Sequence, residues 1–85
     1  SLSDSSIDLL RTLDKAVTVH AYTTDDVTKQ AISEIISRYQ RVKTDFNLRL
    51  LNPDIDIDQV QQDGVVMNKP FAFVLYYNAW NTSIP

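Results

Sequence analysis

The sequence contains no cysteine, one glycine and one histidine among its 85 residues. Without cysteine, disulfide bonds, thiolate metal ligands and thiol redox chemistry are excluded. With His20 as its only histidine, the chain cannot assemble within itself a metal site that needs several imidazoles. It also has no apolar run near the roughly 20 residues that cross a bilayer. The sequence therefore excludes three features that often indicate function: thiol chemistry, a metal site of several histidines and a membrane-spanning segment.

The net charge of the chain further limits the partners that it can bind. Eight lysine and arginine residues against 11 aspartate and glutamate residues give a net charge of −3. Nucleic-acid binding needs a positive field, so we expect no nucleic-acid partner. At 44% hydrophobic residues the composition is that of an ordinary globular domain. We interpret residues 1–85 as one domain.

Hydrophobic periodicity and end signals define the expected elements. Ser3 and Asp4 begin a first helix that ends near Leu13, and alternation after it predicts a strand. Hydroxyl residues ahead of Asp25 and Asp26 begin a long amphipathic helix. Gly64 suits the residue after a short helix. The predicted helices span residues 3–13, 25–43 and 57–63, and the strands span 16–22, 46–51 and 71–77, with a possible edge strand at 80–84.

The element order α-β-α-β-α-β(-β) predicts an α/β fold with a mixed sheet. The segment Phe71–Tyr77 is apolar at nearly every position, which is typical of a central strand covered on both faces. A small three-layer thioredoxin-like domain satisfies this order. The position of the thioredoxin cysteine motif is then held by residues 23–26, and Pro70 stands where a proline, which can be cis, precedes a strand. The sequence is therefore compatible with a thioredoxin-like scaffold but excludes thioredoxin redox chemistry, because it has no cysteine.

The aspartates of the segment 54–58 are the first candidates for chemistry. Alternating carboxylates can bind calcium, but a calcium loop begun at Asp54 would have Gln59 in place of glycine and Val65 in place of glutamate. We therefore expect no metal or cofactor, and read Asp54 and Asp56 as turn or cap residues beside inward-packed isoleucines. An enzyme that uses Asp25, Asp26, Asp54, Asp56 and Asp58 is a third hypothesis. We interpret His20 as a packed structural residue.

Aromatic residues near the end of the sequence are the remaining candidates. Tyr76, Tyr77 and Trp80 predict an interaction surface, because exposed aromatic groups mark binding sites. Aromatic rings also stack on sugars. The alternative function is thus a stand-alone carbohydrate or small-molecule binding domain on a redox-inactive thioredoxin-like scaffold.

A family resemblance rests on several short motifs that follow one another along the chain. They are Leu2-Ser3-Asp4 with a leucine-rich helix, then Val17-x-Val19-x-Ala21-Tyr22, the helix segment 37–41, and the segments 52–54 and 63–65. This pattern resembles the extracytoplasmic domain of gliding-motility-type ABC transporter auxiliary proteins, over residues 2–77.

The resemblance implies a non-enzymatic auxiliary domain of a bacterial ABC-type transport system. It would be periplasmic or otherwise extracytoplasmic and would contact permease or ATPase subunits or another copy of itself. Because the sequence begins with Ser1, we expect a segment of a longer protein whose membrane anchors lie outside it. The resemblance transfers no catalytic residue.

Overall fold

The strands form one three-stranded mixed sheet with β1 at its centre. A computed structural model describes residues 2–78 of the protein. The strand order is β2-β1-β3, in which β1 pairs with β2 in parallel and with β3 in antiparallel orientation. The strands are β1 (Ala16–Thr23), β2 (Phe46–Leu51) and β3 (Phe71–Asn78). The prediction of a mixed α/β fold in this element order is confirmed, and the thioredoxin-like assignment stays a prediction.

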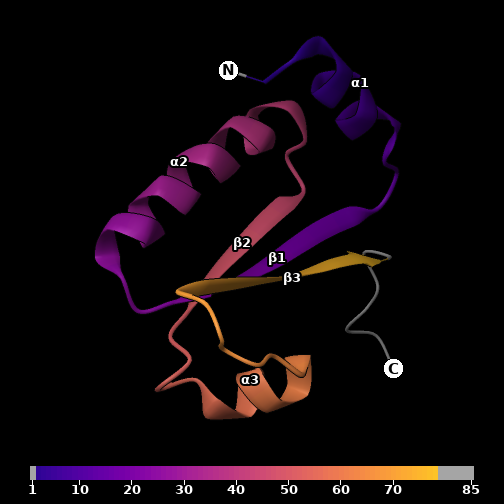
Figure 1. Ribbon diagram of the computed structural model, residues 1–85. Helices are drawn as coiled ribbons and strands as arrows, with labels where there is room; N and C mark the ends of the chain where they lie inside the picture. Colours follow the sequence, from indigo (N-terminus) through magenta and orange to yellow (C-terminus); the bar gives the residue numbers. More distant parts are fainter. Residues whose placement is uncertain (1, 79–85) are drawn as a thin grey trace.

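Three helices cover the two faces of this sheet. Helices α1 (Asp4–Thr12) and α2 (Asp26–Val42) lie on one side, and the short helix α3 (Ile57–Asp63) lies on the other (Figure 1). Helix α2 connects the parallel strands β1 and β2, as such strands require a crossover. The expected element boundaries agree to within about one residue at each end.

Capping side chains explain where the helices begin. The Ser3 hydroxyl accepts from the amide of Ser6 at 3.1 Å, as the sequence predicts. In α2 the cap is Asp25, whose carboxylate accepts from the amide of Thr28 at 2.8 Å, rather than one of the threonines before it. Gly64 ends α3 at φ +69°, a left-handed conformation that glycine adopts without strain.

The apolar core lies between the sheet and the helices α1 and α2. Alternate residues of β1 point into it together with Leu10, Phe46 and two isoleucines of α2. The buried residues of this cluster are Leu10, Val17, Val19, Ala21, Ile32, Ile36 and Phe46. This distribution follows from period-2 and period-3.6 patterning. Val27 shares the apolar spacing of α2 with Ile32 and Ile36, but 78% of it is exposed.

Strand β3 occupies a different position from the one expected. It was predicted to be central and covered on both faces, but among the described residues it pairs with β1 alone. The central strand is β1, because β2 pairs with one of its edges in parallel and β3 pairs with the other edge in antiparallel orientation. The Lys69–Pro70 bond is trans, as are the other peptide bonds of residues 2–78. The edge strand expected at 80–84 lies outside the described residues.

Candidate functional site

Strand β1 presents a polar face toward α3. Its alternation turns His20 and Tyr22 away from the apolar core, and pairing with β3 brings Tyr76 opposite Thr18. His20 and Tyr76 are neighbours on this face, with ring centroids 5.1 Å apart. Three side chains that can donate hydrogen bonds are thus gathered below α3 from two strands.

The carboxylate of Asp63 enters this group from the last residue of α3. It is fully buried, at 0% exposure, and His20 is 9% exposed. The Nδ1 atom of His20 lies 2.7 Å from Oδ2 of Asp63. The Tyr22 hydroxyl donates to the same oxygen, and the Tyr76 hydroxyl donates to Oδ1. We call these four residues, His20, Tyr22, Asp63 and Tyr76, the Asp63 cluster.

The cluster holds Asp63 in its ionised form. Burial alone would raise the pKa of this carboxyl, but hydrogen bonds from Tyr22, Tyr76 and His20 outweigh it and lower the pKa to about 2. An ionised carboxylate can only accept, so Nδ1 of His20 carries a proton. Burial, and then the hydrogen bond to Asp63, raises the pKa of Tyr22. The pKa of Tyr76 is raised first by its hydrogen bond to Asp63. Both phenols therefore remain donors at neutral pH.

The opposite face of β3 is apolar and open. The strand alternates, so that Phe71, Phe73, Leu75 and Tyr77 lie on the side of α1 and α2, opposite Thr23, Ala21, Val19 and Val17 of β1. We call these four β3 residues the β3 strip. Phe73 is 51% exposed and Leu75 60% exposed. The apolar side chains on both faces of β3 predicted that both faces would be covered. On the side of α1 and α2 they are only partly covered.

An apolar groove runs between the β3 strip and α2. Its volume is about 350 Å³, and one wall is formed by Phe71 and Phe73. The other wall belongs to α2, whose Ile35 is about half exposed there. The residues that line it are Val27, Thr28, Ala31, Ile32, Ile35, Phe71 and Phe73. A surface of this composition favours an apolar partner over water.

The predicted interaction surface is divided between the two faces. Tyr76 belongs to the Asp63 cluster, whereas the Tyr77 hydroxyl donates to Oδ1 of Asp14 at 2.8 Å on the other side of the sheet. The hydrogen bond from Tyr77 lowers the pKa of Asp14. Neighbouring residues in a strand point to opposite faces, so these two tyrosines do not form one surface. Trp80 lies outside the described residues.

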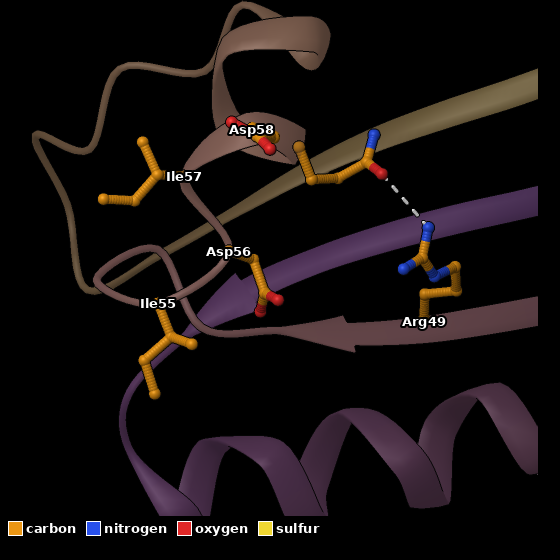
Figure 2. Close-up of a pocket in the computed structure, with 6 residues that line it drawn as sticks. Arg49, Ile55, Asp56, Ile57 and Asp58 are labelled. Atoms are coloured by element: carbon orange, nitrogen blue, oxygen red, sulfur yellow. Dashed lines mark hydrogen bonds between the residues drawn. The ribbon is translucent and has the colours of Figure 1, made fainter.

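The acidic segment before α3 forms a shallow pocket with β2. Figure 2 shows Arg49 on one side of it and Asp56 on the other, with Ile55 directed away from the strands. Asp56 accepts from the amide of Asn52 at 2.8 Å, which confirms its turn role. The expected inward packing of the isoleucines is wrong: Ile55 is 74% exposed and Ile57 is also exposed, because the turn points them to solvent.

The acidic residues that the sequence analysis named do not form a metal centre at this pocket. Within residues 2–78, no group of histidine, aspartate or glutamate side chains has the arrangement that could hold a metal ion. Asp25 caps α2, and Asp26 lies 3.8 Å from Nζ of Lys29 on the exposed side of that helix. Over the same residues, no helix combines the length and hydropathy of a membrane-spanning segment.

Sequence reasoning missed Asp63 as a site residue, because it used Asp63 to mark the end of a helix and as part of the motif at 63–65. The signal that was present is the polar alternation of Thr18, His20 and Tyr22, because a buried polar face needs partners. The partner itself is 43 residues from His20, and no local pattern joins them. The strip was missed for the opposite reason, since its apolar pattern was assigned to burial.

The fold and its two surfaces define a small mixed α/β domain whose sheet has one polar, closed face and one apolar, partly open face. A family model described as a domain of unknown function, DUF7088, matches residues 1–71. The chain therefore belongs to the DUF7088 family. Searches of curated proteins and of solved structures found no match.

Proposed function

We propose that this domain is a non-enzymatic auxiliary module of a bacterial ABC-type transport system, which contacts a partner protein outside the cytoplasm. The observation that carries the proposal is the β3 strip beside the apolar groove. Four alternate residues of one strand are exposed without a charge among them. Exposed apolar area of this kind costs free energy in water, and a partner that covers it regains that free energy.

The occupant we propose is a helix of a permease subunit with an apolar stripe. The groove has one apolar wall from α2 and one from β3. A sheet in a layered α/β fold receives a covering helix on an apolar surface of this kind. Helices pack at about 8–10 Å from their neighbours, so such a helix would lie beside α2 and across Phe73. The resemblance to gliding-motility-type auxiliary proteins supports a transport partner.

This proposal is tested by co-purification of the domain with the permease and ATPase subunits that are encoded beside its gene. We expect the wild-type domain to be retained by the membrane subunit and the double variant F73T/L75T to lose at least about 90% of that binding, because burial of one large apolar side chain contributes about 1.5–3 kcal/mol. The matched control is V66T, which changes an exposed valine on the α3 side.

Two results contradict the proposal. Equal loss of binding in V66T and F73T/L75T would show that the strip is not the contact surface. The absence of permease and ATPase genes beside this gene would remove the transport assignment.

A further inference from the structure

Helix α3 is attached to the sheet by hydrogen bonds and by little apolar burial, since Val60 is only half-buried. None of its seven residues, Ile57–Asp63, is buried as a whole, whereas α2 buries Ile32 and Ile36. The apolar residues around it, among them Ile55, Ile57 and Val66, are exposed. The hydrophobic effect therefore contributes less to holding α3 in place than it does for α2.

Few hydrogen bonds join this part of the chain to the strands. In the described structure, residues 53–69 reach β1, β2 and β3 only through Gln59 and Asp63. Gln59 contributes its carbonyl oxygen, 3.1 Å from the Tyr22 hydroxyl, and its side-chain oxygen, 3.2 Å from Arg49. The other bonds of the segment are internal to it or reach the adjoining Asn52. The buried attachment is centred on one carboxylate.

The donors that receive this carboxylate all belong to the sheet. Tyr76 binds Oδ1, while His20 and Tyr22 bind Oδ2, so the two oxygens of a planar group are recognised separately. If α3 lifts away, these three donors lose their shared acceptor and together face solvent, around the position that the carboxylate has left. A group with two acceptor oxygens in one plane satisfies them best.

We propose that α3 is a detachable cover, held by Asp63, over a carboxylate-binding site formed by His20, Tyr22 and Tyr76. The ligand class is a small organic acid whose carboxylate takes the place of the Asp63 side chain. Asp63 is the built-in occupant of the site, and a free acid binds when α3 opens. The proposal does not involve the β3 strip, so it stands or fails separately from the transport function.

Native-state hydrogen exchange tests the opening on the wild-type 85-residue chain. The amides of Val60, Gly64 and Val65 are hydrogen-bonded within the α3 segment, and that of Val19 lies in the central strand. We expect the α3 amides to have at least about 10-fold lower protection than Val19 and a weaker dependence on urea, because local openings expose less surface than global unfolding. Equal protection and equal urea dependence in both groups would overturn the proposal.

Acetate tests the ligand class. In D63A the site lacks its built-in carboxylate, so sodium acetate at pH 7 is expected to raise the Tm by a few degrees more than sodium chloride or sodium sulfate of the same ionic strength. The matched control is D14A, which removes the carboxylate that Tyr77 binds on the opposite face. An equal response to acetate in D63A and D14A would overturn the proposal.

The wild-type chain supplies a decisive measurement even if D63A does not fold. Acetate that binds only the open state must increase the population of that state. We therefore expect exchange of the Val60 and Gly64 amides to become faster as acetate is added, with no change at Val19 and no effect of sulfate. Exchange that is independent of acetate up to molar concentration would contradict the proposed site.

Discussion

The two faces of β3 show how one strand can be stabilised by opposite means. On the α3 side, Tyr76 donates to a fully buried carboxylate that two further side chains also bind. On the α1 and α2 side, Tyr77 binds the exposed Asp14, and its neighbours Phe73 and Leu75 face solvent. The polar face is closed and the apolar face is open. Water normally favours the reverse, so the buried polar group depends on its hydrogen bonds and the exposed apolar strip is the surface that a partner could cover.

The difference also separates two kinds of energetic sensitivity. Removal of one member of a buried polar group leaves its partners without hydrogen bonds, so the loss is large. Removal of an apolar group from an exposed strip costs the fold little, and its effect is felt in binding. The following variants test this separation, from the largest expected effect to the smallest.

The largest effect is expected for D63A. His20, Tyr22 and Tyr76 would lose their shared acceptor inside the protein, and each buried donor left without a partner costs about 1–3 kcal/mol. Urea unfolding followed by circular dichroism would measure the loss. D14A, in which the lost carboxylate is exposed, is expected to unfold close to the wild-type midpoint. Similar midpoints for both variants would mean that burial of the carboxylate has no energetic consequence.

The pH dependence of stability should carry the signature of the same cluster. The pKa of Asp63 is lowered from 3.8 to about 2, so its stabilising effect is complete above pH 3.8 and is lost as pH falls toward 2. The pKa of Tyr22 and Tyr76 is raised above 10, so their contribution is complete below pH 10 and is lost at higher pH. Thermal melting from pH 2 to pH 11 should show both losses. In D63N the acidic loss should be smaller, and an unchanged acidic limb would contradict the assignment.

A smaller effect is expected for G64A, at the end of α3. Nothing lies within 4 Å of the added methyl group, so the cost comes from φ +69° alone and amounts to about 1 kcal/mol. Hydrogen exchange should show the loss mainly at α3 amides if the α3 side opens separately from the sheet. An equal loss of protection throughout β1 would indicate that α3 and the sheet unfold together.

The smallest effect on stability is expected for F73T/L75T. Both side chains are at least half exposed, and threonine has a high propensity for strands, so the free energy of unfolding should change by less than about 1 kcal/mol. Chemical denaturation provides the measurement. A loss of several kcal/mol would show that the β3 strip belongs to the core, which would remove the contrast between the faces.

The sequence predicted most of the fold because local physics dominates its elements. Ser3 begins α1, Gly64 ends α3, and the periodicity of Ile32 and Ile36 defines the inner side of α2. Alternation in β1 separated Val19 from His20 correctly. These features depend on residues within a few positions of one another, which a single sequence contains.

The candidate site was harder to predict because its partners are distant in the chain. Asp63 meets Tyr22 across 41 residues, and nothing near Asp63 distinguishes it from other aspartates. The position of β3 at the edge of the described sheet depends on pairing, which periodicity does not report. An apolar pattern gives which residues avoid water but not which element covers them, so the strip was assigned to a buried strand.

The most direct test of the contrast is a pair of neighbouring hydroxyl deletions, Y76F and Y77F. Each removes one hydroxyl group and the hydrogen bond that it donates to an aspartate, on opposite faces of the same strand. Y77F also removes the hydrogen bond that the Tyr77 hydroxyl accepts from the exposed amide of Asp14. Urea unfolding should show a loss of about 1–2 kcal/mol for Y76F, whose partner is a buried charge, and less than about half of that loss for Y77F, whose partner is exposed. Equal losses, or a larger loss for Y77F, would contradict the claim that β3 has one closed polar face and one open face.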